Sequence, residues 1–97
     1  MSEVEITRLK VQGKEFLGLR VEMPNAPLLL IKGTIGFAMC GYLNPSTAEK
    51  LGDVAVMVSG VNTFEDMLNA KIKWSSPKAK EIGIEEGRIL RDEIDKL

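Results

Sequence analysis

The sequence contains no histidine and a single cysteine, Cys40, among its 97 residues. Without histidine the chain lacks the most common general base, and neither a Ser-His nor a Cys-His catalytic pair can form. One cysteine and no histidine also argue against a zinc site within one chain, and a lone cysteine cannot form an intrachain disulfide. We therefore predict no metal site and no cofactor.

Long apolar runs and a large excess of either charge are absent too. The apolar run Pro27–Ile31 is far too short to span a membrane. The 13 basic and 14 acidic residues give a net charge of -1, which offers no bulk attraction to nucleic acid or to an anionic membrane. Trp74 and Tyr42 lack the basic surroundings of a nucleic-acid platform. Because Met1–Lys10 is polar and charged, we expect no signal peptide and a cytoplasmic protein.

The length favours one domain, residues 1–97, with a mainly β part over residues 1–43 and alternating helices and strands over residues 44–97. A domain of this size buries only about 60–65 % of its unfolded surface, so association with other copies would add stability. Charged residues make up 28 % and glutamine occurs once, a composition that leans toward a heat-tolerant source.

The chain begins with two alternating apolar segments, Val4–Val11 and Glu15–Met23, which predict two antiparallel strands. Between them, glycine in the first central position of a Gly13-Lys14 turn suits a type II′ hairpin. This turn predicts the following partners across the hairpin: Val11 with Phe16, Ile6 with Val21, and Val4 with Met23.

Both faces of this hairpin carry apolar side chains, with Leu9, Val11 and Phe16 on one and Ile6, Leu17, Leu19 and Val21 on the other. A sheet over a single core usually keeps one face polar. The second apolar face therefore needs a cover. Either a loop or helix of the same chain covers it, or another subunit does, and the residues leave both alternatives open.

Two further strands are expected after a proline-containing loop. Leu28–Lys32 is continuously apolar up to its last residue, as in a strand buried on both sides, and Ile35–Leu43 contains Cys40. Gly33 between them suits another tight turn. From Asn44 the pattern changes, because Asn44 is a good N-cap and Pro45 is favoured in the first helical turn.

The second half predicts short strand-then-helix units. Helices are expected over Pro45–Leu51 and Thr63–Asn69, the latter capped by Asn62 or Thr63. Two short strands and a last helix complete the pattern: Val54–Val58, Lys71–Trp74 and Glu85–Leu97, the helix with Leu90, Ile94 and Leu97 facing inward. The fold class is therefore α+β, with an N-terminal antiparallel β segment over residues 4–43, strand–helix units and a C-terminal helix.

Three short motifs resemble the YunC-like family of small bacterial and archaeal proteins, a domain of unknown function. They are Cys40-Gly41-x-Leu43 at the end of an apolar strand, Gly60-Val61-x-Thr63 before a short helix, and Gly83-Ile84-x-x-Gly87 before the last segment. The resemblance covers nearly the whole chain. It implies an α+β domain whose N-terminal β segment forms a homo-oligomer, a tetramer, and it implies no reaction.

Polar residues gather at the two strand-to-helix junctions. If the strands that end near Leu43 and Val58 are parallel, both helix starts open on the same edge of the sheet, where ligands bind in such folds. A small anionic ligand would then be held by backbone N–H groups and by these residues: Asn44, Ser46, Thr47, Ser59, Gly60, Asn62 and Thr63. The alternative is that these residues only cap helices.

Cys40 is the one candidate nucleophile. A reactive thiol needs a neighbouring cation or a helix N-terminus, whereas the position of Cys40 in an apolar strand favours a buried and inert side chain. The remaining acids and lysines show no paired carboxylates suited to acid–base chemistry. Three hypotheses follow: an oligomer that binds a small anionic metabolite, a small enzyme with a subunit-interface site using Cys40, or a purely structural interaction module.

Overall fold

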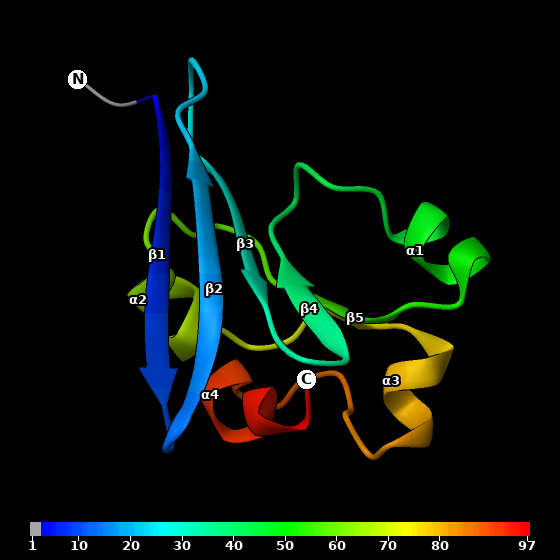
Figure 1. Ribbon diagram of the computed structural model, residues 1–97. Helices are drawn as coiled ribbons and strands as arrows, with labels where there is room; N and C mark the ends of the chain where they lie inside the picture. The colour runs from blue at the N-terminus through cyan, green and yellow to red at the C-terminus, as the bar shows by residue number, and fades with distance from the viewer. Residues whose placement is uncertain (1–2) are drawn as a thin grey trace.

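The structure, a computed structural model, describes residues 3–97 and contains one six-stranded mixed sheet with its strands in chain order (Figure 1). The strands are β1 (Val4–Val11), β2 (Lys14–Val21), β3 (Leu28–Lys32), β4 (Gly36–Met39), β5 (Val54–Met57) and β6 (Trp74–Ser75). All neighbours pair antiparallel except β4 and β5, which are parallel. The helical elements are α1 (Pro45–Leu51), α2 (Phe64–Asn69), α3 (Pro77–Glu81), α4 (Leu90–Glu93) and the 3-10 helix η1 (Ile94–Lys96). The predicted α+β class is confirmed.

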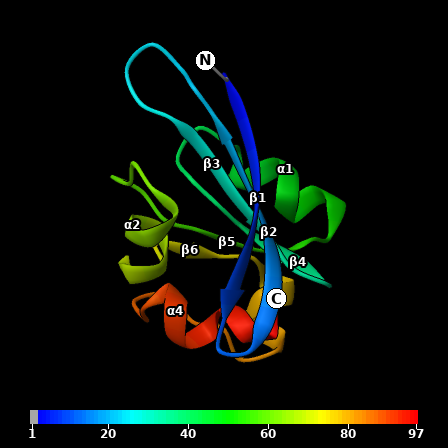
Figure 2. The same cartoon turned by 60° about the vertical axis from the view of Figure 1, so that its left-hand side comes forward.

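The helices are divided unequally between the two faces of the sheet (Figure 2). On the face that we call the core face, α2, α3, α4 and η1 pack their apolar side chains against β1 to β5. On the opposite face, Ala48 of α1 forms a smaller cluster with Met39 and Ala55 of the parallel pair, against which Phe37 and Met57 also pack. No helix within residues 3–97 combines the length and the apolar character that a membrane span requires.

The face opposite the core face is uncovered over the first two strands. We call this part the open face and define it by Val4, Ile6, Leu17, Leu19 and Val21, which share one side of the β1–β2 ladder. The exposed fractions are 49 % for Val4, 66 % for Ile6 and 41 % for Leu17. The sequence left open whether a segment of the same chain or another subunit covers this face. Within residues 3–97, no helix or loop of the same chain covers it. The prediction that both hairpin faces are apolar is confirmed.

The predicted hairpin register is wrong by two positions. The turn is formed by Gln12 and Gly13, with φ angles of 52° and 80°, the pattern of a type I′ turn with two left-handed residues. Val11 therefore pairs with Lys14 instead of Phe16, and the observed partners further along are Ile6 with Leu19 and Val4 with Val21. Because side chains alternate with a period of two, this shift leaves every residue on its predicted face.

Two predicted elements of the second half differ in the structure: the strand predicted over Lys71–Trp74 is replaced by the two-residue β6, Trp74–Ser75, and the last helix is shorter than expected. The last helix begins at Leu90 and not at Glu85, because residues 87–89 pair with residues 71–72. The Ile72 N–H donates to the Arg88 carbonyl, and the Gly87 N–H donates to the Ile72 carbonyl, each at 2.8 Å. The inward stripe of Leu90, Ile94 and Leu97 is confirmed, with exposed fractions of at most 3 %.

The strand predicted over Ile35–Leu43 is limited to β4, because Gly41 and Tyr42 turn away from the sheet. The helix predicted over Pro45–Leu51 is confirmed with these bounds. Asn44 caps it by accepting a hydrogen bond from the Ser46 N–H at 2.9 Å.

The predicted ligand site at the strand-to-helix junctions required the two strands before them to be parallel. The structure confirms this condition, because β4 and β5 pair in parallel. The connection between the two strands carries α1 across the sheet, as parallel neighbours require. The pairing also needs glycine at position 36, because a Cβ there would collide with the carbonyl oxygen of Val54 and would lie 2.9 Å from its Cγ1.

Replacing this glycine tests how strictly the ladder depends on it. We expect Gly36→Ala to lower the free energy of unfolding by about 1–3 kcal/mol, as for other overpacked interiors, measured by urea denaturation followed by circular dichroism. Gly41→Ala is the matched control, because a Cβ at position 41 would meet nothing within 4 Å. Equal stability of the two variants would contradict the steric role of position 36.

Candidate functional site

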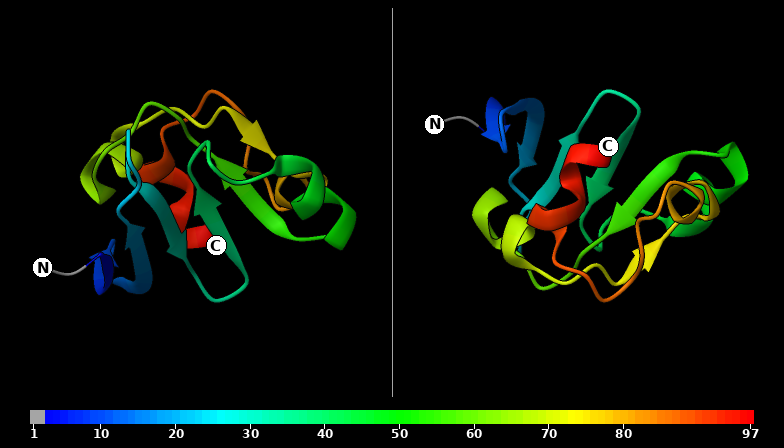
Figure 3. Two further views of the ribbon diagram at one scale, coloured as in Figure 1. Left: turned by 90° about the horizontal axis from the view of Figure 1, so that it is seen from above. Right: turned by 90° about the horizontal axis from the view of Figure 1, so that it is seen from below.

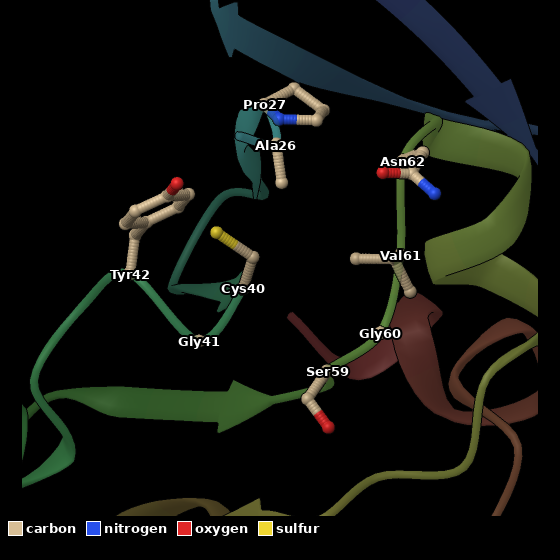
Figure 4. Close-up of a pocket in the computed structure, with 9 residues that line it drawn as sticks. All are labelled: Ala26, Pro27, Cys40, Gly41, Tyr42, Ser59, Gly60, Val61 and Asn62. Carbon is tan, nitrogen blue, oxygen red and sulfur yellow. The ribbon is translucent and has the colours of Figure 1, made fainter. Parts of the chain in front are cut away.

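A pocket lies where the chain leaves the carboxyl ends of β4 and β5 (Figure 4). We call it the carboxyl-end pocket. Its volume is about 350 Å³, within the range of roughly 300–1,000 Å³ that is usual for small-molecule sites. Three loops line it: Ala26 and Pro27 from the loop before β3, Cys40, Gly41 and Tyr42 after β4, and Ser59, Gly60, Val61 and Asn62 after β5.

The hydrogen bonds of Cys40 hold the first residue after β4 against β3. The Cys40 N–H donates to the Leu29 carbonyl at 3.1 Å, and the Leu29 N–H donates to the Cys40 Sγ at 3.3 Å. The side chain is 4 % exposed, which confirms the prediction that it is buried. Its sulfur nevertheless points toward the pocket, between Ala26 and Tyr42 (Figure 4).

The loop after β5 is held from the side of α2. The Asn62 N–H donates to Asp66 Oδ2 at 3.1 Å, and the Asn62 carbonyl accepts from Arg20 Nη1. Arg20 in turn contacts Glu22 through its Nε at 2.7 Å. This cation is therefore already engaged by the protein, and no charged side chain is among the residues that line the pocket.

Backbone amides add hydrogen-bond donors to the polar side chains of the lining, which carry no charge. Within residues 3–97, the N–H groups of these loop residues donate no hydrogen bond: Gly41, Tyr42, Ser59, Gly60 and Val61. Four of these five residues are exposed and only Val61 is buried, so water can satisfy their N–H groups, and a ligand with acceptor oxygens would replace that water. Clustered N–H groups in loops favour anions and other oxygen-rich groups.

The structure brings four of the predicted site residues together. Cys40, Ser59, Gly60 and Asn62 all line the carboxyl-end pocket, although the Ser59 hydroxyl points away from the thiol (Figure 4). Thr63 does not line it. Its Oγ1 accepts the Asp66 N–H at 3.0 Å as the N-cap of α2, which is the alternative role considered for it.

The other three predicted residues lie at α1. Asn44 and Ser46 form the helix cap described above, and Asn44 and Thr47 line a different cavity on the opposite face of the sheet. The prediction also missed Ala26, Pro27, Gly41, Tyr42 and Val61. The prolines before β3 predict a loop there, but no sequence pattern indicates that this loop lies over Cys40.

This second cavity, the α1 groove, has a volume of about 420 Å³ and lies between α1 and the strands β3 and β4. Its walls are apolar and consist of Leu30, Phe37, Met39, Leu43, Ala48 and Leu51. The polar lining residues are Lys32, Asn44, Thr47 and Asp53. Both views in Figure 3 show α1, in green, on the opposite side of the molecule from β1 and β2, in blue.

The acidic side chains form no metal-binding group within the described chain, residues 3–97. Glu65 pairs with Arg91, and Asp66 is used in the cap of α2. The buried carboxylate of Glu93 contacts Lys96 at 2.9 Å and Arg88 at 3.4 Å, which ties the C-terminal segment together. These contacts give the charged residues structural roles.

Comparison with known proteins places the chain in a family. A model of the family described as "domain of unknown function (DUF1805)" matches residues 39–97. The chain is 29 % identical over 98 residues to the uncharacterized protein YunC of Bacillus subtilis, and the match covers 97 % of each. A crystal structure of a protein of unknown function, TA1206 from Thermoplasma acidophilum, is 48 % identical with a TM-score of 0.93, covering 97 % of this chain and 92 % of that one. The chain belongs to the DUF1805 family, and its resemblance to YunC-like proteins is confirmed.

The burial of Cys40 leads to a prediction about its reactivity. We expect a water-soluble disulfide reagent to label the native protein about a hundredfold more slowly than the urea-unfolded protein, because the reagent must wait for local opening. Stopped-flow absorbance measures both rates, and Cys40→Ser supplies the unlabelled control. Stoichiometric labelling of the native protein at the unfolded rate would contradict this prediction.

Proposed function

For this member of the DUF1805 family, we propose that the chain binds a small anionic metabolite in the carboxyl-end pocket. The observation that carries the proposal is the set of loop amides without protein acceptors around a cavity of about 350 Å³. This cavity lies at the carboxyl ends of the parallel strands β4 and β5, which is where ligands bind in sheets with such a pair.

The class of ligand follows from the lining. Amide N–H groups are donors, so the complementary groups are the acceptor oxygens of a carboxylate or a phosphate. Ala26, Pro27 and Val61 add an apolar wall for the carbon part of the molecule. The absence of a lysine or arginine from the lining favours a ligand of low charge over a polyphosphate, because a highly charged anion needs cationic partners when it leaves water.

A charge placed in the pocket tests the proposal. We expect a thermal-shift screen of small carboxylates and monophosphates to find an anion that raises Tm, by roughly 4–8 °C for each kcal/mol of binding free energy. Ala26→Asp should abolish this shift, because the carboxylate repels the anion. Ala26→Asn has nearly the same size without the charge and should retain it. Equal shifts for both variants, or no stabilising anion in the screen, would contradict the proposal.

The thiol in the same pocket supports a second candidate, a small enzyme that uses Cys40. The supporting observation is the direction of the Sγ, which faces the cavity and the Tyr42 ring (Figure 4). The variant Cys40→Ser distinguishes the two candidates. Both should keep the anion-induced shift in Tm, but an enzyme that uses Cys40 should also lose its turnover. A cytoplasmic location stays a prediction in either case.

We also propose that the protein works as a homo-oligomer that covers the open face, with a tetramer as the expected size. Val4, Ile6 and Leu17 expose apolar surface there, with Arg8 paired to Leu17 on the same side, and contiguous apolar patches of more than a few hundred Å² usually mark an interaction site. Covering such surface is worth roughly 25 cal/mol per Å² before association costs. If the protein is a purely structural interaction module, the open face alone would carry its function.

Two exposed isoleucines provide a matched test of assembly. We expect the wild type to sediment above its 10.7 kDa chain mass and Ile6→Lys to lower the sedimentation coefficient toward that of the monomer without loss of circular dichroism. Ile82→Lys is the control, because Ile82 is 40 % exposed and lies outside the open face. A wild type that sediments at micromolar concentration as a single 10.7 kDa species would refute the proposal.

A further inference from the structure

The α1 groove combines an apolar interior with two opposite charges at one end. Lys32 and Asp53 line both this groove and a smaller adjoining cavity of about 140 Å³ beside the turn between β3 and β4. Phe37 is the third residue shared by the two cavities, so Lys32, Phe37 and Asp53 lie where the cavities meet. Apolar walls with a few placed polar groups are the usual form of a small-molecule site.

Neither charge is used by the protein itself. Within the described part of the chain, the Lys32 ammonium and the Asp53 carboxylate make no ion pair and no hydrogen bond, to each other or to other residues. Lys32 is exposed and Asp53 is half-buried, so both residues are accessible to a ligand.

The Asp53 backbone is fixed on both sides. Its N–H donates to the Ala48 carbonyl at 3.0 Å, and its own carbonyl accepts the Ser76 hydroxyl at 2.7 Å. Lys32 is the last residue of β3 and is paired with Leu17 and Phe37. Both charges therefore project from ordered backbone, which lowers the entropy cost of holding a ligand between them.

We propose that the α1 groove binds an apolar α-amino acid as its zwitterion. The α-carboxylate pairs with Lys32, the α-ammonium pairs with Asp53, and the apolar side chain enters the groove among Leu30, Met39 and Leu51. A ligand with only one charge would leave the opposite protein charge unpaired beside an apolar wall. The zwitterion matches both charges and adds no net charge to the site.

This site is separate from the carboxyl-end pocket. The α1 groove is bounded by the apolar cluster that α1 forms with β4 and β5, whereas Cys40 belongs to the cluster on the core face. The two proposals can therefore fail independently. Ala26→Asp, which tests the carboxyl-end pocket, should leave amino-acid binding to the groove unchanged.

Isothermal titration calorimetry with L-leucine as the probe tests the proposal on the full chain. We expect saturable binding and three ligand controls that each weaken it roughly tenfold or more, since each removes one contact to a charge or the apolar contact. Leucinamide lacks the carboxylate, N-acetyl-leucine lacks the ammonium, and glycine lacks the apolar side chain. These controls need no variant of the protein.

Matched variants then assign the contacts. Lys32→Met and Asp53→Asn should each weaken leucine binding by a similar factor, whereas Lys73→Met and Asp92→Asn remove exposed charges elsewhere and should not. Three outcomes would overturn the proposal: no saturable heat with leucine, glycine binding as tightly as leucine, or unchanged affinity in both groove variants. A groove covered by a second copy of the chain would give the first of these outcomes.

Discussion

The parallel pairing of β4 and β5 is the constraint on which the rest of the molecule depends. Antiparallel strands can follow one another through tight turns, but a parallel neighbour requires the chain to return across the sheet before it pairs. Here that return carries α1, and it places the ends of both strands at one edge. The two loops that follow, after Met39 and after Met57, must then run side by side, and the carboxyl-end pocket lies between them and the loop before β3. Gly36 permits this pairing, because the carbonyl of Val54 occupies the space of a side chain.

Much of this arrangement could be predicted from local patterns. The bounds of α1 follow from Asn44, Pro45 and Gly52, whose capping roles depend on neighbouring atoms only. The period of two predicted correctly which residues share each face of the N-terminal hairpin, although the predicted turn was wrong. The register itself was not predictable in the same way, since Gln12 adopts a left-handed conformation that its residue type does not favour. Likewise, the start of the last helix is delayed by pairing with residues 71–72, a contact between segments that no local pattern contains.

The candidate site, too, could be predicted where it depends on local patterns and not where it depends on contacts between distant segments. The junctions at residues 44–47 and 59–63 were identified because polar caps follow apolar strands, yet only the second junction lies at the carboxyl-end pocket. The side chains at a junction depend on where the next helix goes. After β4 the chain crosses to the face opposite the core face, which takes Asn44 and Thr47 to the α1 groove. After β5 it turns to the core face, so Gly60 and Asn62 stay beside Cys40. Local sequence patterns identify the helix caps, but they do not show to which face of the sheet the chain turns after each strand.

The same crossings explain why one apolar face stays open. Within residues 3–97, α1 is the one helix on its side of the sheet, and all later helical segments pack on the core face, where Met67, Ala79, Leu90 and Ile94 are buried. The core face thereby receives the apolar side chains of α2, α3, α4 and η1, the second cluster with α1 covers part of β4 and β5, and the outer side of β1 and β2 receives no helix. Ile6 and Leu17 are nevertheless apolar, in strands whose alternation would accept polar residues there without disturbing the core. An exposed apolar side chain adds little to the folding of a single chain, and this exposed surface is the feature that supports the proposed homo-oligomer.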